Sequence, residues 1–266
     1  MYNNEERELL KQKIEHFSKQ LDEVQGLLLV GSGATGYRDQ YSDLDLLVVV
    51  NNSQKVLTVQ NKLQTYLHTQ YRILEEKVYQ HEPDIFVTCF LFNNYLGLDL
   101  GIWSLNKLRA TKPNWLVLFD RDPNKLEKKL VQSLKIHTHQ NLEEMIEDSL
   151  TFIWQFFRSS AIAIKRQQYI QAIREIDFIR CHIIRFICQK HHIHDDFEKS
   201  IDHITDPHVQ KLQRTYEVKL EQYSMQQLLR DVLSLYFSVI NISESAIQLK
   251  QQEMLDEFIR DLFEGT

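Results

Sequence analysis

Apolar residues follow two different patterns along the chain, and the change between them divides the sequence. In the first half, short continuous apolar runs alternate with polar stretches, which is typical of buried strands. These runs predict strands at residues 27–30, 46–50, 71–79, 85–92, 95–103 and 115–119, and helical spacing predicts helices around residues 9–21 and 55–68. From about residue 127, apolar residues recur with a helical period instead.

The helical period is clearest in two stripes of the second half. They are formed by Ile176, Ile179, Ile183 and Ile187, and by Leu228, Val232, Leu235, Val239 and Ile242. We therefore predict an α+β fold class: an N-terminal α/β domain with a small mixed sheet at residues 1–125, then an all-α helical bundle at residues 126–266.

The composition is that of an ordinary globular protein, and its charge excludes one class of partner. Asp and Glu number 37 against 31 Lys and Arg, so the formal net charge is −6. The basic surface that double-stranded nucleic acid requires is therefore not expected. No apolar run approaches the length of a membrane span, and the charged N-terminus lacks the apolar core of a signal peptide. We expect a cytoplasmic protein.

Cysteine and histidine give no metal-binding pattern. Cys89, Cys181 and Cys188 are odd in number and lack CxxC spacing, so neither a disulfide framework nor a zinc site is predicted. The His-rich tract at residues 190–194 adjoins two aspartates, and we interpret it as a solvated helix end.

Candidate chemistry is concentrated between the first two predicted strands. Gly31-Ser32 ends one apolar run, and a turn of small residues leaves backbone N–H groups free for phosphate at a helix N-terminus. Asp43 and Asp45 open the next run on one strand face, about 7 Å apart at Cα. Two carboxylates so placed repel each other unless a cation joins them, and hard oxygen ligands favour Mg²⁺.

A third carboxylate is expected from a neighbouring strand. Asp99 interrupts an otherwise apolar strand, and a buried charge there is costly unless it faces a metal ion or an open cleft. Asp84 is the nearby rival, although it follows Pro83, where a turn acid is ordinary. Three acids are able to hold two ions, one for the attacking hydroxyl and one for the leaving pyrophosphate.

Together these motifs resemble the polymerase-beta-type nucleotidyltransferase superfamily, whose pattern is a Gly-Ser turn, an acid-x-acid pair and a third acid. The segments 39–45, 98–100 and 116–122 are more closely similar to bacterial aminoglycoside 6-adenylyltransferases and lincosamide nucleotidyltransferases. The resemblance implies catalytic roles for Asp43, Asp45 and Asp99, the same three acids as metal ligands, and nucleotide contacts from Gly31, Ser32, Ser42 and Arg38.

The reaction implied by the resemblance is transfer of a nucleoside monophosphate, AMP from ATP, to a hydroxyl group with the help of Mg²⁺. The leading acceptor is a small antibiotic-type molecule, an aminoglycoside or a lincosamide, bound between the two domains by a monomer or homodimer. The resemblance makes the helical domain at residues 126–266 the substrate-binding domain. Two alternatives stay open: a protein or tRNA acceptor, as in toxin-system nucleotidyltransferases, and a non-catalytic nucleotide-binding module.

Overall fold

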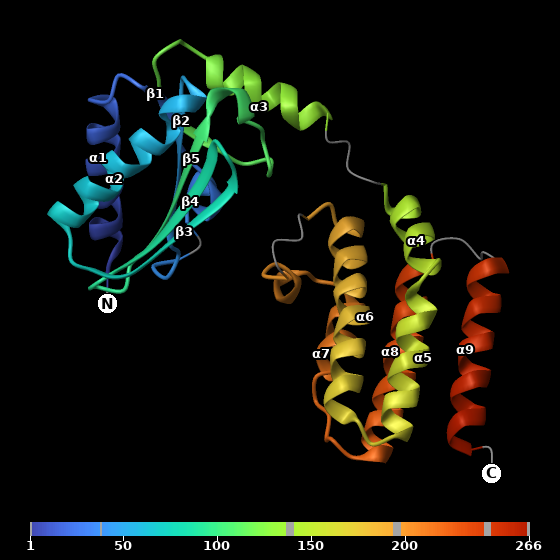
Figure 1. Cartoon of the computed structure of the whole chain (residues 1–266). Coiled ribbons are helices and arrows are strands. Elements are labelled where there is room, and N and C mark those ends of the chain that lie inside the picture. Colours follow the sequence, from blue (N-terminus) through green and yellow to red (C-terminus); the bar gives the residue numbers. More distant parts are fainter. Residues whose placement is uncertain (1, 38, 137–140, 194–197, 242–245, 265–266) are drawn as a thin grey trace. The chain divides into compact units, whose positions relative to one another are not determined.

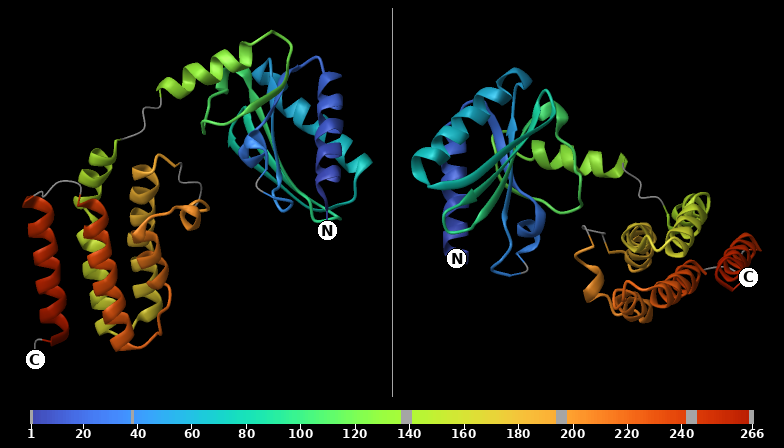
Figure 2. Two further views of the ribbon diagram at one scale, coloured as in Figure 1. Left: turned by 180° about the vertical axis from the view of Figure 1, so that it is seen from behind. Right: turned by 60° about the horizontal axis from the view of Figure 1, so that its bottom comes forward.

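The computed structural model describes residues 2–37, 39–136, 141–193, 198–241 and 246–264. The chain divides into two compact units, Met1–Thr138 and His139–Thr266. Figures 1 and 2 show the sheet-containing first unit and the helical second unit. The predicted fold class, a small mixed sheet followed by helices, is confirmed.

The first unit is built on a six-stranded mixed sheet with the order β3-β4-β5-β2-β1-β6. Strands β2 and β5 run parallel, and each other neighbouring pair is antiparallel. The strand bounds are β1 Val24–Leu29, β2 Leu44–Val50, β3 Ile73–Glu82, β4 Ile85–Phe92, β5 Gly97–Ser104 and β6 Leu116–Asp120.

The two faces of the sheet have different roles because successive side chains along a strand alternate between them. Even-numbered residues of β2 join a core under α1 (Asn4–Lys19) and α2 (Val56–Gln70), and Figure 1 shows these two helices together on one face. Odd-numbered residues of β2 face the other side. There Leu47 and Val49 pack with Leu126 and Leu130 of α3.

Helix α1 begins with a capping box. The Asn3 side chain accepts from the backbone N–H of Glu6, and the Glu6 carboxylate accepts from the N–H of Asn3, so two otherwise unpaired donors are satisfied. The helix then buries Leu10 and Ile14 against the sheet. The capping box therefore fixes the first turn of α1, which carries Arg7.

The β4–β5 connection is a tight turn around Asn93 and Asn94, and the residue with positive φ is the next one along the chain. Tyr95 has φ 67°. Asn94 uses its side chain instead, since its Oδ1 accepts from the backbone N–H of Leu96 at 3.2 Å.

Helix α3 (Lys125–Ile136) lies just beyond the predicted domain boundary at 125/126, yet it belongs to the first compact unit. Its apolar residues Leu126 and Leu130 are buried against the sheet, so the units divide after residue 138. The assignment of residues 126–266 to substrate binding stays a prediction.

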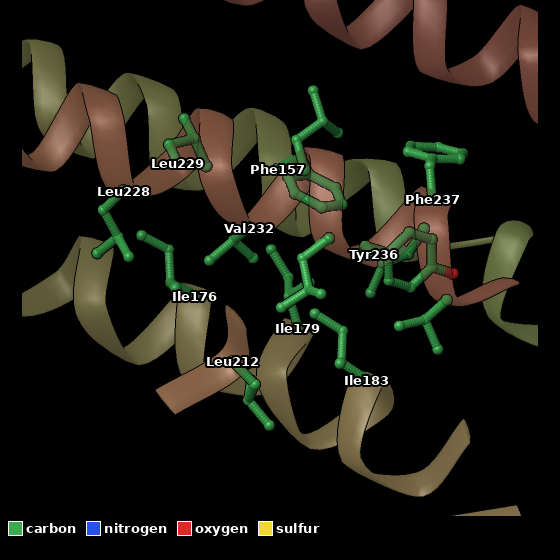
Figure 3. Packing of buried hydrophobic residues seen from close by; sticks show 14 of the residues in the cluster. Phe157, Ile176, Ile179, Ile183, Leu212, Leu228, Leu229, Val232, Tyr236 and Phe237 are labelled. Carbon is green, nitrogen blue, oxygen red and sulfur yellow. The ribbon is translucent and has the colours of Figure 1, made fainter. Parts of the chain in front are cut away.

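The second unit packs helices around one apolar core. Its helices are α4 Leu142–Leu150, α5 Ile153–Lys165, α6 Tyr169–Lys190, α7 Pro207–Arg214, α8 Gln222–Ile240 and α9 Ala246–Glu264. Figure 3 shows Phe157 of α5, Ile179 of α6 and Val232 of α8 pointing toward one another, all fully buried. Both predicted stripes are therefore core residues, apart from Ile242, which lies outside the described residues.

Across the described ranges, none of the helices combines the length and the apolar character needed to cross a lipid bilayer.

Candidate functional site

Two of the predicted acids face each other across the only parallel strand pair described in the sheet. Asp45 of β2 and Asp99 of β5 are register partners. Both occupy odd-numbered positions and so lie on the face opposite α1 and α2. Asp99 is exposed and Asp45 is half-buried, so these neighbouring carboxylates are open to a ligand.

Asp43 lies one residue before β2, which begins at Leu44. A Cβ added to Gly97, at the start of β5, would lie 2.5 Å from Asp43 Oδ1. The carboxylate is therefore packed directly against the Gly97 backbone. The sequence predicts that Asp43 and Asp45 share a strand face. Asp43 lies in the loop one residue before the strand, beside Gly97, where it continues the register that pairs Asp45 with Asp99.

The Gly31-Ser32 turn forms a short 3₁₀ helix, η1 (Gly31–Thr35), rather than the start of a long α-helix. Gly31 has φ 61°, and a Cβ at this position would lie 2.1 Å from Asp45 Oδ2. Only glycine therefore leaves room for the Asp45 carboxylate. The first N–H groups of such a turn have no acceptor within it, as the phosphate-binding prediction requires.

The remaining predicted nucleotide contacts have different outcomes. The Ser42 carbonyl accepts from Arg7 Nη1 at 2.6 Å and from the Tyr2 hydroxyl at 3.2 Å, and the Ser42 hydroxyl lies 3.5 Å from Asp39 Oδ1. Ser42 is thus engaged in holding its own loop. Arg38 lies outside the described residues.

The hydroxyl of Tyr2 lies in the electrostatic neighbourhood of the acids. Burial raises its pKa, and the charge of Asp43 raises it further, whereas the nearby Arg7 guanidinium lowers it. Tyr2 therefore stays a neutral hydrogen-bond donor to the loop that carries Asp43.

Cys89 is a neighbour of the acids that the sequence does not reveal. It pairs with Asp99 in the antiparallel β4–β5 ladder, on the same face of the sheet. Burial raises the pKa of its thiol to about 12, with further contributions from a hydrogen bond to Asp99 and from the charges of Asp99 and Asp45. A row of Cys89, Asp99 and Asp45 thus crosses three adjacent strands.

A pocket of about 220 Å³ opens beside this row. Asp45 and Asp99 lie on its wall together with Gly31, and its remaining lining includes Trp103, Arg109, Lys112 and Trp115. This volume is smaller than the roughly 300–1,000 Å³ of a site for a whole drug-sized ligand. The pocket therefore has room for part of a nucleotide.

The aromatic and basic residues of the pocket are held by specific contacts. The Arg109 guanidinium lies 5.2 Å from the centre of the Trp103 ring and 3.6 Å from Glu82 Oε1. The indole N–H of Trp103 is buried without a hydrogen-bond partner. A ligand in this pocket would meet aromatic faces and positive charge next to the two acids.

The rival acid Asp84 lies elsewhere. Its Oδ2 accepts from the Ser104 hydroxyl at 2.5 Å, at the opposite end of β5 from Asp99. The pocket lining does not include it.

Among the residues that the structure describes, no three His, Cys, Asp or Glu side chains are gathered closely enough to hold a metal ion by themselves. In the His-rich tract, residues 191–193 are exposed, as predicted for a solvated helix end, and His191 Nε2 hydrogen-bonds Asp206 Oδ2 at 2.9 Å. His194 lies outside the described residues.

The segment that holds the acids also matches a known family. Residues 10–104 match the family model described as a nucleotidyltransferase domain, and this stretch runs from α1 to the end of β5. The predicted resemblance to nucleotidyltransferases is confirmed for this stretch, and with it the predicted enzyme class, a transferase.

Two solved structures match the chain at low sequence identity. An aminoglycoside 6-adenyltransferase from Bacillus subtilis matches with a TM-score of 0.41 and 13% identity, over 97% of this chain and 98% of that chain. A nucleotidyltransferase-like protein from Exiguobacterium sibiricum 255-15 matches with a TM-score of 0.40 and 14% identity, over 97% of this chain and 90% of that chain. Among curated proteins, no match is found.

Proposed function

We propose that this enzyme transfers AMP from ATP to a hydroxyl group of a small molecule, with Asp43, Asp45 and Asp99 at the reacting centre. The observation that carries the proposal is the parallel register of Asp45 and Asp99 beside the Gly31 turn, inside a nucleotidyltransferase domain. The sequence resemblance makes an aminoglycoside or lincosamide the leading acceptor class.

The donor set fits Mg²⁺ in its chemistry. Asp45 and Asp99 offer hard carboxylate oxygens from adjacent strands, and Asp43 stands two residues before Asp45. Mg²⁺ takes one or two carboxylates and fills its shell with waters and substrate phosphates, so a gathered group of three protein ligands is not required. When bound, Mg²⁺ supplies positive charge that offsets the charge developing on the phosphates.

The chain's own residues divide the remaining work. The N–H groups at the start of η1 would donate to the triphosphate, and Arg109 and Lys112 bring positive charge to the pocket wall. Asp99 is more exposed than its register partner Asp45, and its carboxylate accepts the proton of the attacking hydroxyl. The acceptor oxygen then bonds to the α-phosphorus as the bond to pyrophosphate breaks.

The lining of the pocket suits a nucleotide. Apolar side chains and two indole rings line it, and two basic side chains and two acids reach its wall. An aromatic base matches the indole rings, and an anionic phosphate chain matches Arg109 and Lys112, while Asp45 and Asp99 stay available to the metal ion. We therefore assign this pocket to the nucleoside triphosphate. Cys89, Cys181 and Cys188, all within the described ranges, form no disulfide, which fits a reducing, cytoplasmic setting.

Pyrophosphate release tests the proposal directly. The wild-type protein is incubated with Mg²⁺, each nucleoside triphosphate in turn, and a panel of aminoglycosides and lincosamides, with labelled nucleotide to detect transfer to protein or tRNA. We expect ATP to support turnover and Asp99→Asn to lower kcat at least about 100-fold.

Asp84→Asn is the matched control, because it makes the same change in an acid that hydrogen-bonds Ser104 away from the pocket. It should keep near-wild-type turnover. Equal activity of Asp99→Asn and wild type would remove Asp99 from the mechanism, and tight nucleotide binding without turnover on any acceptor would favour a non-catalytic module.

A further inference from the structure

The first turn of α1 places a buried guanidinium beside the loop that leads into β2. Arg7 is 2% exposed. Its Nη1 donates to the Ser42 carbonyl at 2.6 Å and lies 3.4 Å from the Asp39 carbonyl, while its Nη2 donates to Asn4 Oδ1 at 2.9 Å. These contacts hold the loop immediately before Asp43.

Arg7 also holds the end of the glycine turn. Its guanidinium carbon lies 3.6 Å from the centre of the ring of Tyr37, which lies two residues after the end of η1. Tyr37 has φ 27°, and its hydroxyl is buried without a hydrogen-bond partner. One side chain therefore contacts both the segment after η1 and the segment before β2.

This arrangement is costly for stability alone. The Nε of Arg7 is buried without a partner, and an unsatisfied buried donor costs free energy. Replacing a buried ionic group by an apolar side chain of similar size is often neutral or stabilising. An arginine at this position is better explained by the loop that it holds in place.

The same end of α1 reaches the second acid-bearing segment. Asn94 Nδ2 donates to Glu6 Oε1 at 3.3 Å, and Asn94 belongs to the turn that leads into Gly97 and Asp99. The Tyr2 hydroxyl adds its hydrogen bond to the Ser42 carbonyl. Residues from one helix start thus contact the approaches to both β2 and β5.

We propose that Arg7 is a positioning residue for nucleotidyl transfer, and that the start of α1 sets the placement of the Asp43–Asp45 segment relative to Asp99. The inference rests on the proposed function for its kinetic consequence. Arg7 precedes residues 10–104, which match the family model, so it is an element outside the matched pattern.

Arg121, whose side chain is exposed, provides a control within the same domain. It also donates to backbone carbonyls, those of Val24 at 2.6 Å, Lys19 at 2.9 Å and Leu21 at 3.0 Å. These carbonyls lie where α1 ends and β1 begins, at the other end of the helix. Arg121→Met therefore removes the same kind of anchor without touching the loop before Asp43.

The experiment compares Arg7→Met, Arg7→Lys and Arg121→Met in the full chain. Arg7→Met should lower kcat about 100-fold, since displacement of reacting groups by about 1 Å has that effect, with KM for ATP changed only a few-fold. The Mg²⁺ concentration for half-maximal rate should rise several-fold. Arg7→Lys keeps the charge without the planar fork and should fall between Arg7→Met and wild type.

Hydrogen exchange separates this inference from the proposed function. Backbone amides of residues 39–43 should exchange faster in Arg7→Met than in the wild type, and at the wild-type rate in Arg121→Met. This measurement does not require a known acceptor substrate. The inference would be overturned if residues 39–43 exchanged at the wild-type rate in Arg7→Met. It would also be overturned if Arg7→Met and Arg121→Met lost kcat equally at equal thermal midpoints. If Arg7→Met does not fold, the same criteria apply to Arg7→Lys.

Discussion

Replacing Gly31 with alanine is expected to disable the acids while leaving the domain folded. The added Cβ would lie 2.1 Å from Asp45 Oδ2, whereas ordinary contacts begin at 3.4 Å. The carboxylate oxygen must therefore move by about 1.3 Å, the difference between these two distances. A shift of this size in a reacting group costs about 100-fold in rate, or about 2.7 kcal/mol in barrier height.

Alanine at position 31 also strains the backbone, and the same substitution at Gly36 measures the effect of that strain separately. Gly31 has φ +61° and Gly36 has φ +93°, so alanine at either position adopts a left-handed conformation that costs about 1–2 kcal/mol. A Cβ on Gly36 meets no atom within 4 Å. Gly36→Ala thus reproduces the strain without the displacement of Asp45.

The assay measures kcat for pyrophosphate release and the urea midpoint of both variants. The two midpoints should fall by similar amounts, while kcat should fall about 100-fold in Gly31→Ala and stay near wild type in Gly36→Ala. A similar loss of kcat in both variants would show that turn strain, rather than the Asp45 contact, controls activity. Full activity of Gly31→Ala would refute the placement of Asp45 at the reacting centre.

Two further predictions concern other contacts. Gly97→Ala places a Cβ 2.5 Å from Asp43 Oδ1, so kcat should fall roughly tenfold with little change in thermal midpoint, and an unchanged kcat would exclude Asp43 from the site. Burial alone would raise the pKa of Asp206, but hydrogen bonds from His191 and His208 outweigh it and hold the pKa well below its usual range. Asp206→Asn should therefore cost about 2 kcal/mol at pH 7 in urea unfolding. This stabilisation is complete above the unfolded pKa of about 3.9 and is lost as pH falls through the lower folded value, so a cost that grows on acidification would contradict it.

The strands and the helical stripes were predictable from sequence because their periods are directly visible there. Strand β4, for example, is an almost continuous apolar run, whose side chains alternate between buried and half-buried positions from Phe86 to Phe92. The Ile176 to Ile187 stripe recurs at helical spacing. The end of the first compact unit was harder to predict. Helix α3 has the same amphipathic pattern as the later helices, and only its packing shows that Leu126 and Leu130 face the sheet.

The acids of the site were predictable, whereas their supporting residues were not. Asp45 and Asp99 interrupt apolar runs, and an acid in such a place needs an explanation. Arg7 and Cys89 carry no such signal, because an arginine in a charged helix start and a cysteine in an apolar strand are ordinary residues. Their contribution depends on the β4–β5 register and on the return of the 39–42 loop to α1, which no local pattern encodes.

The two acid–glycine contacts explain why the site is built across β2 and β5. In a parallel ladder the register that pairs Asp45 with Asp99 also brings Asp43 to Gly97, one step before the first paired residues. Gly31 gives Asp45 the same close approach from the end of β1. Asp43 therefore packs against Gly97, and Asp45 packs against Gly31. A larger residue at either glycine would move one of these acids while leaving the other in place. The positions of the three acids are thus set by backbone on both sides, which is the preorganisation that charge stabilisation during phosphoryl transfer requires.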